Sequence, residues 1–523
     1  MSQHTATAPV PESVARTPVE KDYVAEVATL WQELAHEGTR PSGTELAAAL
    51  ATRLGLPVSA AQGVLQGFQS LLHYALGEQA AGSTALEEER QSVQVALATV
   101  RPVLEARLQQ RLDAADARTP EIVCAQCGRR CVAQGRRRRT WRSTVGELSL
   151  RRRYGWCAPC AEGRAPAQAA VGLPASPLTA GLEELTTLLA TTVPHTMAVQ
   201  LVQQMLGLEV SAQAVKSSVE RRAAQVIQLA DAEAQEVQDY QAKWEKAPPY
   251  LTASTPARAV DVAYLELDGV LVLTRAAPAG ESAPPGRGGP GRHYTVTGRE
   301  VKNAILYEDV ACVQESARRG AMLAKTYLSV LGTWLPLACL IWVALLKRGW
   351  QRARLLVVLS DGAKWIRSLC HWLPVPVLLM LDLYYVKHKL WELAATLYGE
   401  GTAAARVWAQ EQEERIEQGQ VGLVLAALAA LAETQPKARD QLASVQTYVR
   451  RNQDRMNYPQ YRAQGLRVGS GAIESTNYHV TGARLKLQGM RWSVVGAAQM
   501  ARLRADLFNG VWQERSRQIL FAS

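Results

Sequence analysis

The sequence has little of what marks secreted and membrane proteins. Its first residues, MSQHTATAPVPESVARTPVEK, include no apolar core of the kind that a secretory signal contains, so we expect no such signal. One run without a charged residue, 327–346, approaches the length of a membrane span, but Pro336 and Gly332 interrupt it. The pattern predicts instead a buried core helix over about residues 325–347, no membrane partner and a cytoplasmic chain.

Cysteine is also scarce, with eight residues in a chain of 523. Such a content is typical of metal-binding or core cysteines rather than of a disulfide-stabilised secreted scaffold. The hydrophobic share of 48% and the charged share of 20% are ordinary for a folded protein and exclude general disorder. At ~150 residues per domain, the length predicts roughly three or four folded units.

Positive charge is concentrated in one short segment of the chain. Residues 121–165 contain eleven arginines against three glutamates, a surplus of eight within a total net charge of +10. Such a cluster predicts a polyanionic partner, and DNA phosphates are the expected ligands, although a solvated charged face is the alternative. The arginines expected to contact DNA are Arg136, Arg137, Arg138, Arg139, Arg151, Arg152 and Arg153.

Two CxxC pairs lie in the same segment. They are formed by Cys124 with Cys127 and by Cys157 with Cys160, and 29 residues separate the inner cysteines. Four thiolates in two such pairs suit a structural Zn²⁺ ion, and the strand-like TVGELSLRRRYGWC between them favours a hairpin as in a zinc ribbon. Two buried or redox-active pairs are the alternative, and Cys131 is a spare thiol nearby.

Periodicity and turn residues divide the chain into segments of different expected structure. Helical segments lie on either side of the cysteine-containing module, and the C-terminal half alternates strands with helices. The expected boundaries are 1–20 for a disordered tail, 21–118 for an N-terminal helical domain, 119–170 for the zinc-ribbon-like basic module, 175–248 for a second helical block, 255–398 and 465–515 for a catalytic core, and 399–464 for a helical insertion.

The second helical block has the pattern of a helix-turn-helix. Two helical stretches within about residues 195–225 are joined at GLEVS, where Gly207 breaks the first and Ser211 can cap the second. Base-specific recognition of DNA would come from this block.

Three carboxylates stand at positions where catalytic metal ligands occur. Asp268 and Asp361 each end a strand pattern, and Glu474 lies in the first turn of a helix after the helical insertion. Each has a local alternative: a type I′ turn at Asp268–Gly269, a helix N-cap at Asp361, and a favourable helix-dipole position for Glu474. If they converge at one sheet edge, they would hold two Mg²⁺ or Mn²⁺ ions for phosphodiester chemistry.

Five stretches surround these carboxylates in a fixed order: LELDGVLV, REVKNAILYEDV, VVLSDGAKWI, LDLYYVKHKLWELA and GSGAIESTNYHVTGARLKLQGMRW. With the CxxC pairs, they resemble bacterial insertion-sequence transposases of the Kra-type group, distant relatives of the Mutator-like DDE enzymes. The resemblance covers roughly residues 120–512.

The resemblance implies a multidomain α+β fold with a ribonuclease H-like α/β core, interrupted by an all-helical insertion before Glu474. It also implies that Asp268, Asp361 and Glu474 share the catalytic metals. The activity would be DNA strand cleavage and strand transfer at the ends of an insertion sequence. The partners would be terminal inverted repeats and target DNA, bound by a homodimer or higher oligomer in the bacterial nucleoid.

The segment after the second strand departs from this pattern. Relatives carry a histidine soon after the aspartate of the LD-aromatic stretch, whereas here Tyr385 follows Asp382 in that place. His388 lies one helical turn further on and is the expected substitute. A domesticated, non-catalytic DNA-binding protein and another nuclease of the same fold are the alternative functions.

The helix after Glu474 is basic. Arg484, Lys486 and Arg491 run away from the expected metal site along a path that a DNA backbone could follow. An ordinary positively charged surface helix is the alternative.

Overall fold

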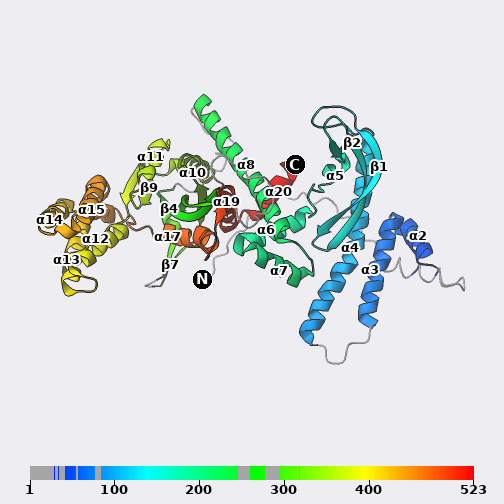
Figure 1. The fold of residues 1–523 in the computed structure, drawn as a ribbon, viewed down its shortest axis with the longest axis horizontal. Coiled ribbons are helices and arrows are strands. Elements are labelled where there is room, and N and C mark those ends of the chain that lie inside the picture. Colours follow the sequence, from blue (N-terminus) through cyan, green and yellow to red (C-terminus); the bar gives the residue numbers. More distant parts are fainter. Residues whose placement is uncertain are drawn as a thin grey trace, which may run out of the picture. The chain divides into compact units, whose positions relative to one another are not determined.

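The computed structural model describes residues 42–54, 57–76, 84–244, 260–276, 294–316 and 319–522, together with positions 29 and 33. The expected N-terminal tail and the loop rich in glycine and proline after residue 276 lie outside the described residues. Contacts divide the chain into two compact units, of which the first comprises Met1–Leu182 and Val202–Leu208 and the second comprises Glu183–Leu201 and Glu209–Ser523. The fold is a multidomain mixture of helices and strands (Figure 1).

From residue 42 on, the described part of the first unit contains the helices α2 (Gly43–Leu54), α3 (Val58–Leu76) and α4 (Ala85–Arg118). Figure 1 shows α3 and α4 side by side as a helical hairpin. Their close approach depends on Gly63 and Gly67, since a Cβ atom at these positions would lie 2.8 and 2.6 Å from the backbone carbonyl oxygens of Pro102 and Thr99.

The basic module is an antiparallel sheet in the order β1-β2-β3. Its elements are β1 (Val132–Ser143), β2 (Gly146–Cys157), β3 (Glu162–Arg164) and the short helix α5 (Pro166–Ala170). Trp141 and Leu150 of this sheet are fully buried and pack with Leu112 of α4 in one hydrophobic cluster. The helical domain and the basic module expected on either side of residue 118 therefore share a core.

Three helices follow, α6 (Ala180–Thr192), α7 (His195–Leu206) and α8 (Ala212–Trp244). As expected, Gly207 ends α7 with a positive φ of 67°, and Ser211 caps α8 by accepting a hydrogen bond from the Ala214 backbone N–H at 3.1 Å. The second helix has 33 residues and extends far beyond the expected helix-turn-helix.

A mixed sheet forms the centre of the second unit, with the order β10-β9-β4-β5-β8. Its strands are β4 (Val262–Ala276), β5 (Thr295–Glu308), β8 (Lys325–Leu331), β9 (Leu355–Ser360) and β10 (Val377–Leu381). The strand β5 runs antiparallel to β4 and β8, whereas β4, β9 and β10 are parallel. The short strand β11 (Trp492–Ser493) joins the far end of β4, and β6 (Cys312–Ser316) with β7 (Arg319–Met322) forms a separate hairpin.

One face of the sheet is covered by α10 (Leu335–Arg348) and α11 (Lys364–Trp372), which pack with Leu265 and Leu267 of β4. The expected helix over residues 325–347 is wrong in its first part, because residues 325–331 form the strand β8. Gly332 has a φ of 118°, and Pro336 lies in the first turn of α10. Among the described residues, no helix is long and apolar enough to cross a membrane.

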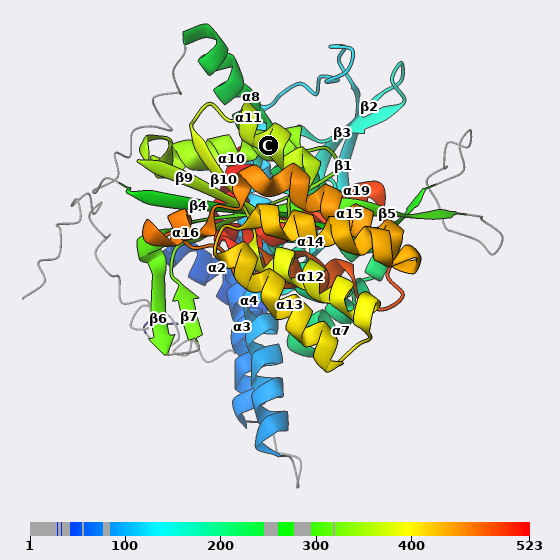
Figure 2. The ribbon, with the colours of Figure 1, turned by 90° about the vertical axis from the view of Figure 1, so that its left-hand side faces the viewer.

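The opposite face is covered by the helices that follow β10. They are α12 (Leu383–Tyr398), α13 (Ala403–Glu417), α14 (Val421–Thr434), α15 (Arg439–Asn452), α16 (Tyr458–Ala463) and α17 (Gly471–Thr476). Figure 2 shows α12 to α15 gathered together. Leu428 of α14 and Leu442 of α15 share a hydrophobic cluster with Tyr264 of β4 and Leu359 of β9. The described insertion is helical throughout, as its composition predicts.

The chain closes with a π-helix over Asn477–Gly482 directly after α17, then α18 (Ala483–Leu485), α19 (Val494–Phe508) and α20 (Trp512–Ala522). A π-helix is rare and is frequently found at functional sites. This one begins within one turn of Glu474.

Candidate active site and metal centre

Asp268 lies in the middle of β4, not at the end of a strand. The strand continues through Gly269, whose backbone is not in the positive-φ conformation that a type I′ turn requires, so a turn here is the wrong interpretation. The carboxylate of Glu300 occupies the space where a Gly269 side chain would be. Because side chains alternate along a strand, Asp268 shares a face with Tyr264 and Glu266, the face covered by α12 to α17.

Asp361 follows β9 directly, as its sequence context predicts. Leu267 of β4 pairs with Ser360 of β9, so the next residues, Asp268 and Asp361, occupy matching positions on neighbouring parallel strands. Asp361 accepts a hydrogen bond from the Ala363 backbone N–H at 2.9 Å, and Ala363 is itself the N-cap of α11. The helix-cap explanation for Asp361 is therefore wrong.

The two aspartates form an electrostatically strained pair. Burial raises the pKa of Asp268 to about 6, and the negative charges of Asp361 and Glu300 act in the same direction. Burial and the charge of Glu300 also raise the pKa of Asp361, which Lys389 opposes. A divalent cation bound between hard carboxylate oxygens would relieve this repulsion.

A chain of hydrogen bonds holds Asp268 from the opposite side. Its carboxylate accepts hydrogen bonds from the Gly269 backbone N–H at 2.7 Å and from the side-chain amide of Asn477 at 2.5 Å. Asn303, which pairs with Asp268 across the strands, donates to the side chains of Asn477 and Thr481 at 2.8 and 2.9 Å. Both asparagines were missed by sequence reasoning. The one signal was a polar residue within the apolar strand VKNAILY.

Glu474 does not join the two aspartates in this structure. It is exposed in α17 and lines a cavity of about 890 Å³ whose wall includes Glu266 and Asp382. Asn477, one helical turn later, takes the place beside Asp268. Among the described residues, the three expected carboxylates do not form a group whose ligand atoms reach one ion.

Two buried carboxylates hold α17 against the sheet through hydrogen bonds. Glu266, only 1% exposed, accepts hydrogen bonds from the Tyr307 hydroxyl and from the Ile473 backbone N–H, and burial raises its pKa to about 7. Asp382 caps α12 through the Tyr385 backbone N–H and also accepts from the backbone N–H and hydroxyl of Ser470. The expected auxiliary Asp382 thus orients the helix that carries Glu474. Sequence reasoning missed Glu266, although its spacing of two from Asp268 places both on one face.

Lys389, rather than His388, interacts electrostatically with Asp361. His388 is exposed and lies 3.2 Å from Glu392, so its expected role as a substitute for Tyr385 is not supported by its position. The ammonium of Lys389 lies 4.8 Å from the Tyr385 ring centroid and lowers the pKa of Asp361. Sequence spacing could not decide this, because adjacent helical positions point about 100° apart.

The four expected cysteine ligands meet in the first unit. The sulfur atoms of Cys124, Cys127, Cys157 and Cys160 all lie within 4.8 Å of one another. Cys131 lies outside this group and packs under Gly155. Gly128, with a φ of 69°, completes the tight turn after the first pair. These cysteines could hold a metal ion such as zinc, and they are the one such group found in the described part of the chain.

The expected DNA-contacting arginines of the module divide into two sets. Arg137, Arg138 and Arg151 are exposed, and Arg136, also exposed, pairs with Asp113 at 2.8 Å. The others have roles inside the fold: Arg139 donates to the Ala175 and Ser176 carbonyls, Arg152 is buried beside Tyr154, and Arg153 donates to the Asp116, Thr119 and Pro120 carbonyls. Only the first set is placed to meet a ligand.

The basic helix after Glu474 is also divided. Arg484 is 1% exposed, donates to the Ala190 carbonyl at 2.9 Å and stacks on the Trp492 ring, so it does not lie on an exposed basic surface as expected. Burial and the charge of Arg504 lower its pKa to about 10. Lys486 and Arg491 are exposed.

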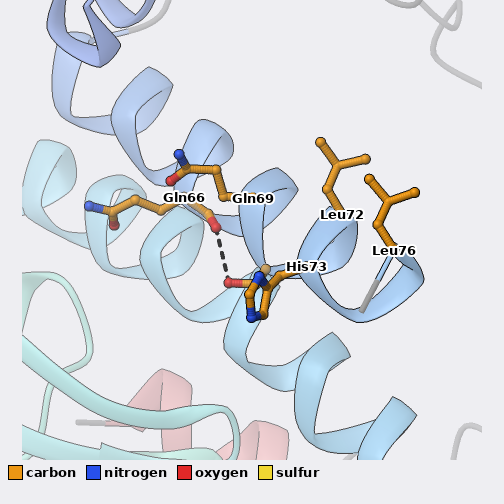
Figure 3. Close-up of a pocket in the computed structure, with 6 residues that line it drawn as sticks. Gln66, Gln69, Leu72, His73 and Leu76 are labelled. Carbon is orange, nitrogen blue, oxygen red and sulfur yellow. Dashed lines mark hydrogen bonds between the residues drawn. The ribbon is translucent and has the colours of Figure 1, made fainter. Parts of the chain in front are cut away.

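A hollow on α3 in the first unit offers no comparable chemistry (Figure 3). All its lining residues come from this one helix, and His73 is the single titratable side chain among them. The hydrogen bond drawn there joins the Ser70 hydroxyl to the Gln66 carbonyl at 3.1 Å, which is a contact within the helix.

A sequence profile for a family described as Uncharacterised protein family (UPF0236) matches residues 345–519. The matched stretch includes Asp361 and Glu474 and leaves out Asp268. No curated protein matches the chain. The description of the family names no activity.

Proposed function

We propose that the protein is a DDE transposase with a ribonuclease H-like core, which cleaves DNA strands at the ends of an insertion sequence and transfers them to target DNA. The observation that carries the proposal is the meeting of Asp268 and Asp361 on neighbouring parallel strands, under the helix that bears Glu474. Two carboxylates whose pKa values are both raised by burial, next to a helix with a third, suit a site for divalent cations.

The order of the elements supports the same fold. A ribonuclease H-like core is a mixed sheet in which the second strand of the chain runs antiparallel, and β5 has this direction between β4 and β8. An insertion that is helical over its described residues separates Asp361 from Glu474, as the resemblance to insertion-sequence transposases implies.

Asp268, Asp361 and Glu474 would hold Mg²⁺ or Mn²⁺. Bound cations would stabilise the attacking and leaving oxygens while water hydrolyses a phosphodiester at the element end, and while the freed 3′ hydroxyl then attacks a phosphodiester of the target. The Gly269 backbone N–H and Asn477 orient Asp268 for this role, and Lys389 offsets negative charge at Asp361. Glu266 anchors α17 and so sets the height of Glu474 above the sheet.

The first unit would supply DNA binding that is independent of sequence. A structural Zn²⁺ on the four cysteines would fix the ends of β2 and the turn before β1, as in a zinc ribbon. The exposed Arg137, Arg138 and Arg151 would then contact backbone phosphates without regard to sequence. The helices α7 and α8 are the proposed readers of the terminal repeats, and two DNA ends call for at least two subunits.

A non-catalytic DNA-binding protein derived from a transposase is the second candidate. One observation favours it: Asn477 binds the Asp268 oxygen that a metal would need, and Glu474 lies in a different cavity. In that case the protein would still bind DNA, and the three carboxylates would have no catalytic role.

Cleavage of the DNA that flanks the gene distinguishes the two candidates. The full chain would be incubated with this DNA and Mg²⁺ or Mn²⁺, alongside Asp268→Asn, Asp361→Asn and Glu474→Gln. Asp440→Asn, an exposed carboxylate of α15, is the matched control and should cleave normally. Each of the three variants should lose at least about a hundredfold in rate. Cleavage that survives all three substitutions rules out the DDE assignment, and DNA binding without cleavage by the wild type favours the second candidate.

A further inference from the structure

A second cavity in the second unit has a different character from the carboxylate site. Its volume is about 250 Å³, and its walls come from α7, α8, the end of β4 and the segment that leads into α19. The residues that give it its chemistry are His195, Lys216, Arg275, Arg484, Arg491 and Trp492.

The cavity has an excess of positive charge. Four permanent cations line it against one acid, Glu220, which lies 3.5 Å from Lys216. Arg275 and Arg491 form no ion pair within the described parts of the chain, and Arg275 instead stacks on Tyr294. Cations that outnumber the acids around a small cavity create a positive potential, which attracts an anion.

His195 presents a polar atom that lacks a partner. Its Nε2 atom is buried, and no hydrogen-bond partner is found for it in the described structure. Burial, together with the charges of Arg484 and Lys216, lowers the pKa of His195 to about 4, so the ring is neutral at physiological pH. A buried polar atom without a partner at the edge of a cavity is satisfied when a ligand enters.

The deepest cation is held rigidly. Arg484 is almost completely buried, bonded to the Ala190 carbonyl, and stacked on Trp492 with 4.9 Å between guanidinium carbon and ring centroid. Its guanidinium is therefore fixed before any ligand arrives. Ser493, which caps the 15-residue helix α19, and Gly496 in the first turn of that helix also line the cavity. The helix N-terminus adds further positive potential.

We propose that this cavity binds a phosphate group of the DNA substrate, outside the carboxylate site. The proposal rests on the proposed function for the identity of DNA. Arg275 lies further along the same strand as Asp268. Since a strand rises by roughly 3.3 Å per residue, the two residues lie about 23 Å apart. A DNA strand would bridge that distance with roughly seven nucleotides, at ~3.4 Å each. The cavity would thus fix the path of the strand that passes the carboxylates.

The test measures binding without cleavage. Full-length Asp361→Asn protein, with chelator present, would be titrated calorimetrically with inorganic phosphate at constant ionic strength. Arg275→Gln and Arg491→Gln, both exposed residues, should each weaken binding about tenfold, and Arg406→Gln, an exposed arginine of α13, should leave it unchanged. Phosphate affinity that neither cavity variant lowers would overturn the proposal.

A competition experiment then identifies the source of the phosphate group. A short oligonucleotide should displace inorganic phosphate from the wild-type cavity, and it should bind the two cavity variants more weakly than the Arg406→Gln control. Phosphate binding that an oligonucleotide cannot displace would overturn the assignment to DNA and would indicate a free phosphate compound. Because no divalent metal is present, a failure of the proposed catalytic function would show in the cleavage assay and not here.

Discussion

The side-chain amide of Asn477 donates a hydrogen bond to Oδ2 of Asp268 at 2.5 Å. Asn477 also accepts from Asn303, so it connects the central strand β4 to β5 through the π-helix. The amide thus stands where a third carboxylate would join the two aspartates, and its hydrogen bond stabilises the ionised form of Asp268.

Replacing Asn477 with alanine removes a hydrogen bond that favours the charged form of Asp268. The pKa of Asp268 should therefore rise above its present value of about 6, and stability should fall by about 1 kcal/mol. NMR titration of the carboxyl and denaturant unfolding measure the two effects. Asn457→Ala, at an exposed site, is the control, and an unchanged Asp268 titration would contradict the role given to Asn477.

Asp268→Asn should stabilise the metal-free protein. A carboxyl whose pKa is raised from 3.8 to about 6 by folding destabilises the folded state above that pH, and neutralisation removes this cost, roughly 1 to 3 kcal/mol. The free energy of unfolding of the wild type should fall by this amount as pH rises from about 4 to about 6. The variant should therefore be more stable than the wild type at pH 7.5 and equally stable below pH ~4. Chemical unfolding with chelator measures it. An advantage that persists at low pH would point to another cause.

Divalent cations should raise the melting temperature of the wild type. The cation would bind only the folded arrangement of Asp268 and Asp361, and mass action then stabilises that state. Asp361→Asn should show at most a small response to Mn²⁺, whereas Asp440→Asn should respond as the wild type does. An equal response in all three proteins would place cation binding elsewhere.

The four-cysteine group should hold one zinc ion per chain. Cys124→Ser should abolish the zinc content and lower the melting temperature by at least about 5 °C, because metal binding contributes to folding of the module. Cys131→Ala should retain the metal, since Cys131 lies outside the group. Elemental analysis of purified protein measures both, and a full zinc complement in Cys124→Ser would contradict the ligand assignment.

Arg484→Gln should reduce the stability of the folded protein in addition to any effect on DNA affinity. The guanidinium is buried, bonded to Ala190 and stacked on Trp492, so its loss should cost about 2 to 3 kcal/mol. Lys486→Gln, at an exposed position of the same segment, should change stability by less than about 0.5 kcal/mol. Thermal and chemical unfolding distinguish the two, and equal stabilities would contradict the structural role of Arg484.

Local patterns predicted a large part of the fold. The four-cysteine group follows from the spacing of Cys124, Cys127, Cys157 and Cys160, because each pair forms its own turn. The strand before Asp361 and the helices of the insertion follow from runs of apolar residues with clear periodicity.

The predictions that were wrong concern features that depend on contacts between residues distant in sequence. Arg484 lies in a run of basic residues that predicts a charged surface, but the carbonyl of Ala190, 294 residues away in sequence, accepts its hydrogen bond inside the fold. Asp268–Gly269 has the composition of a turn, and only the pairing of β4 with two neighbours keeps it extended. The choice between His388 and Lys389 depends on the rotation of α12, which packing fixes.

The shared core of α4 and the cysteine module limits how the chain can be dissected. Cutting after residue 118 would expose Leu112 on one fragment and Trp141 and Leu150 on the other, all of them fully buried in the intact unit. Fragments made at that boundary would be prone to aggregate, even with zinc bound. A truncation that preserves the module must therefore begin no later than Thr84, whose capping box starts α4.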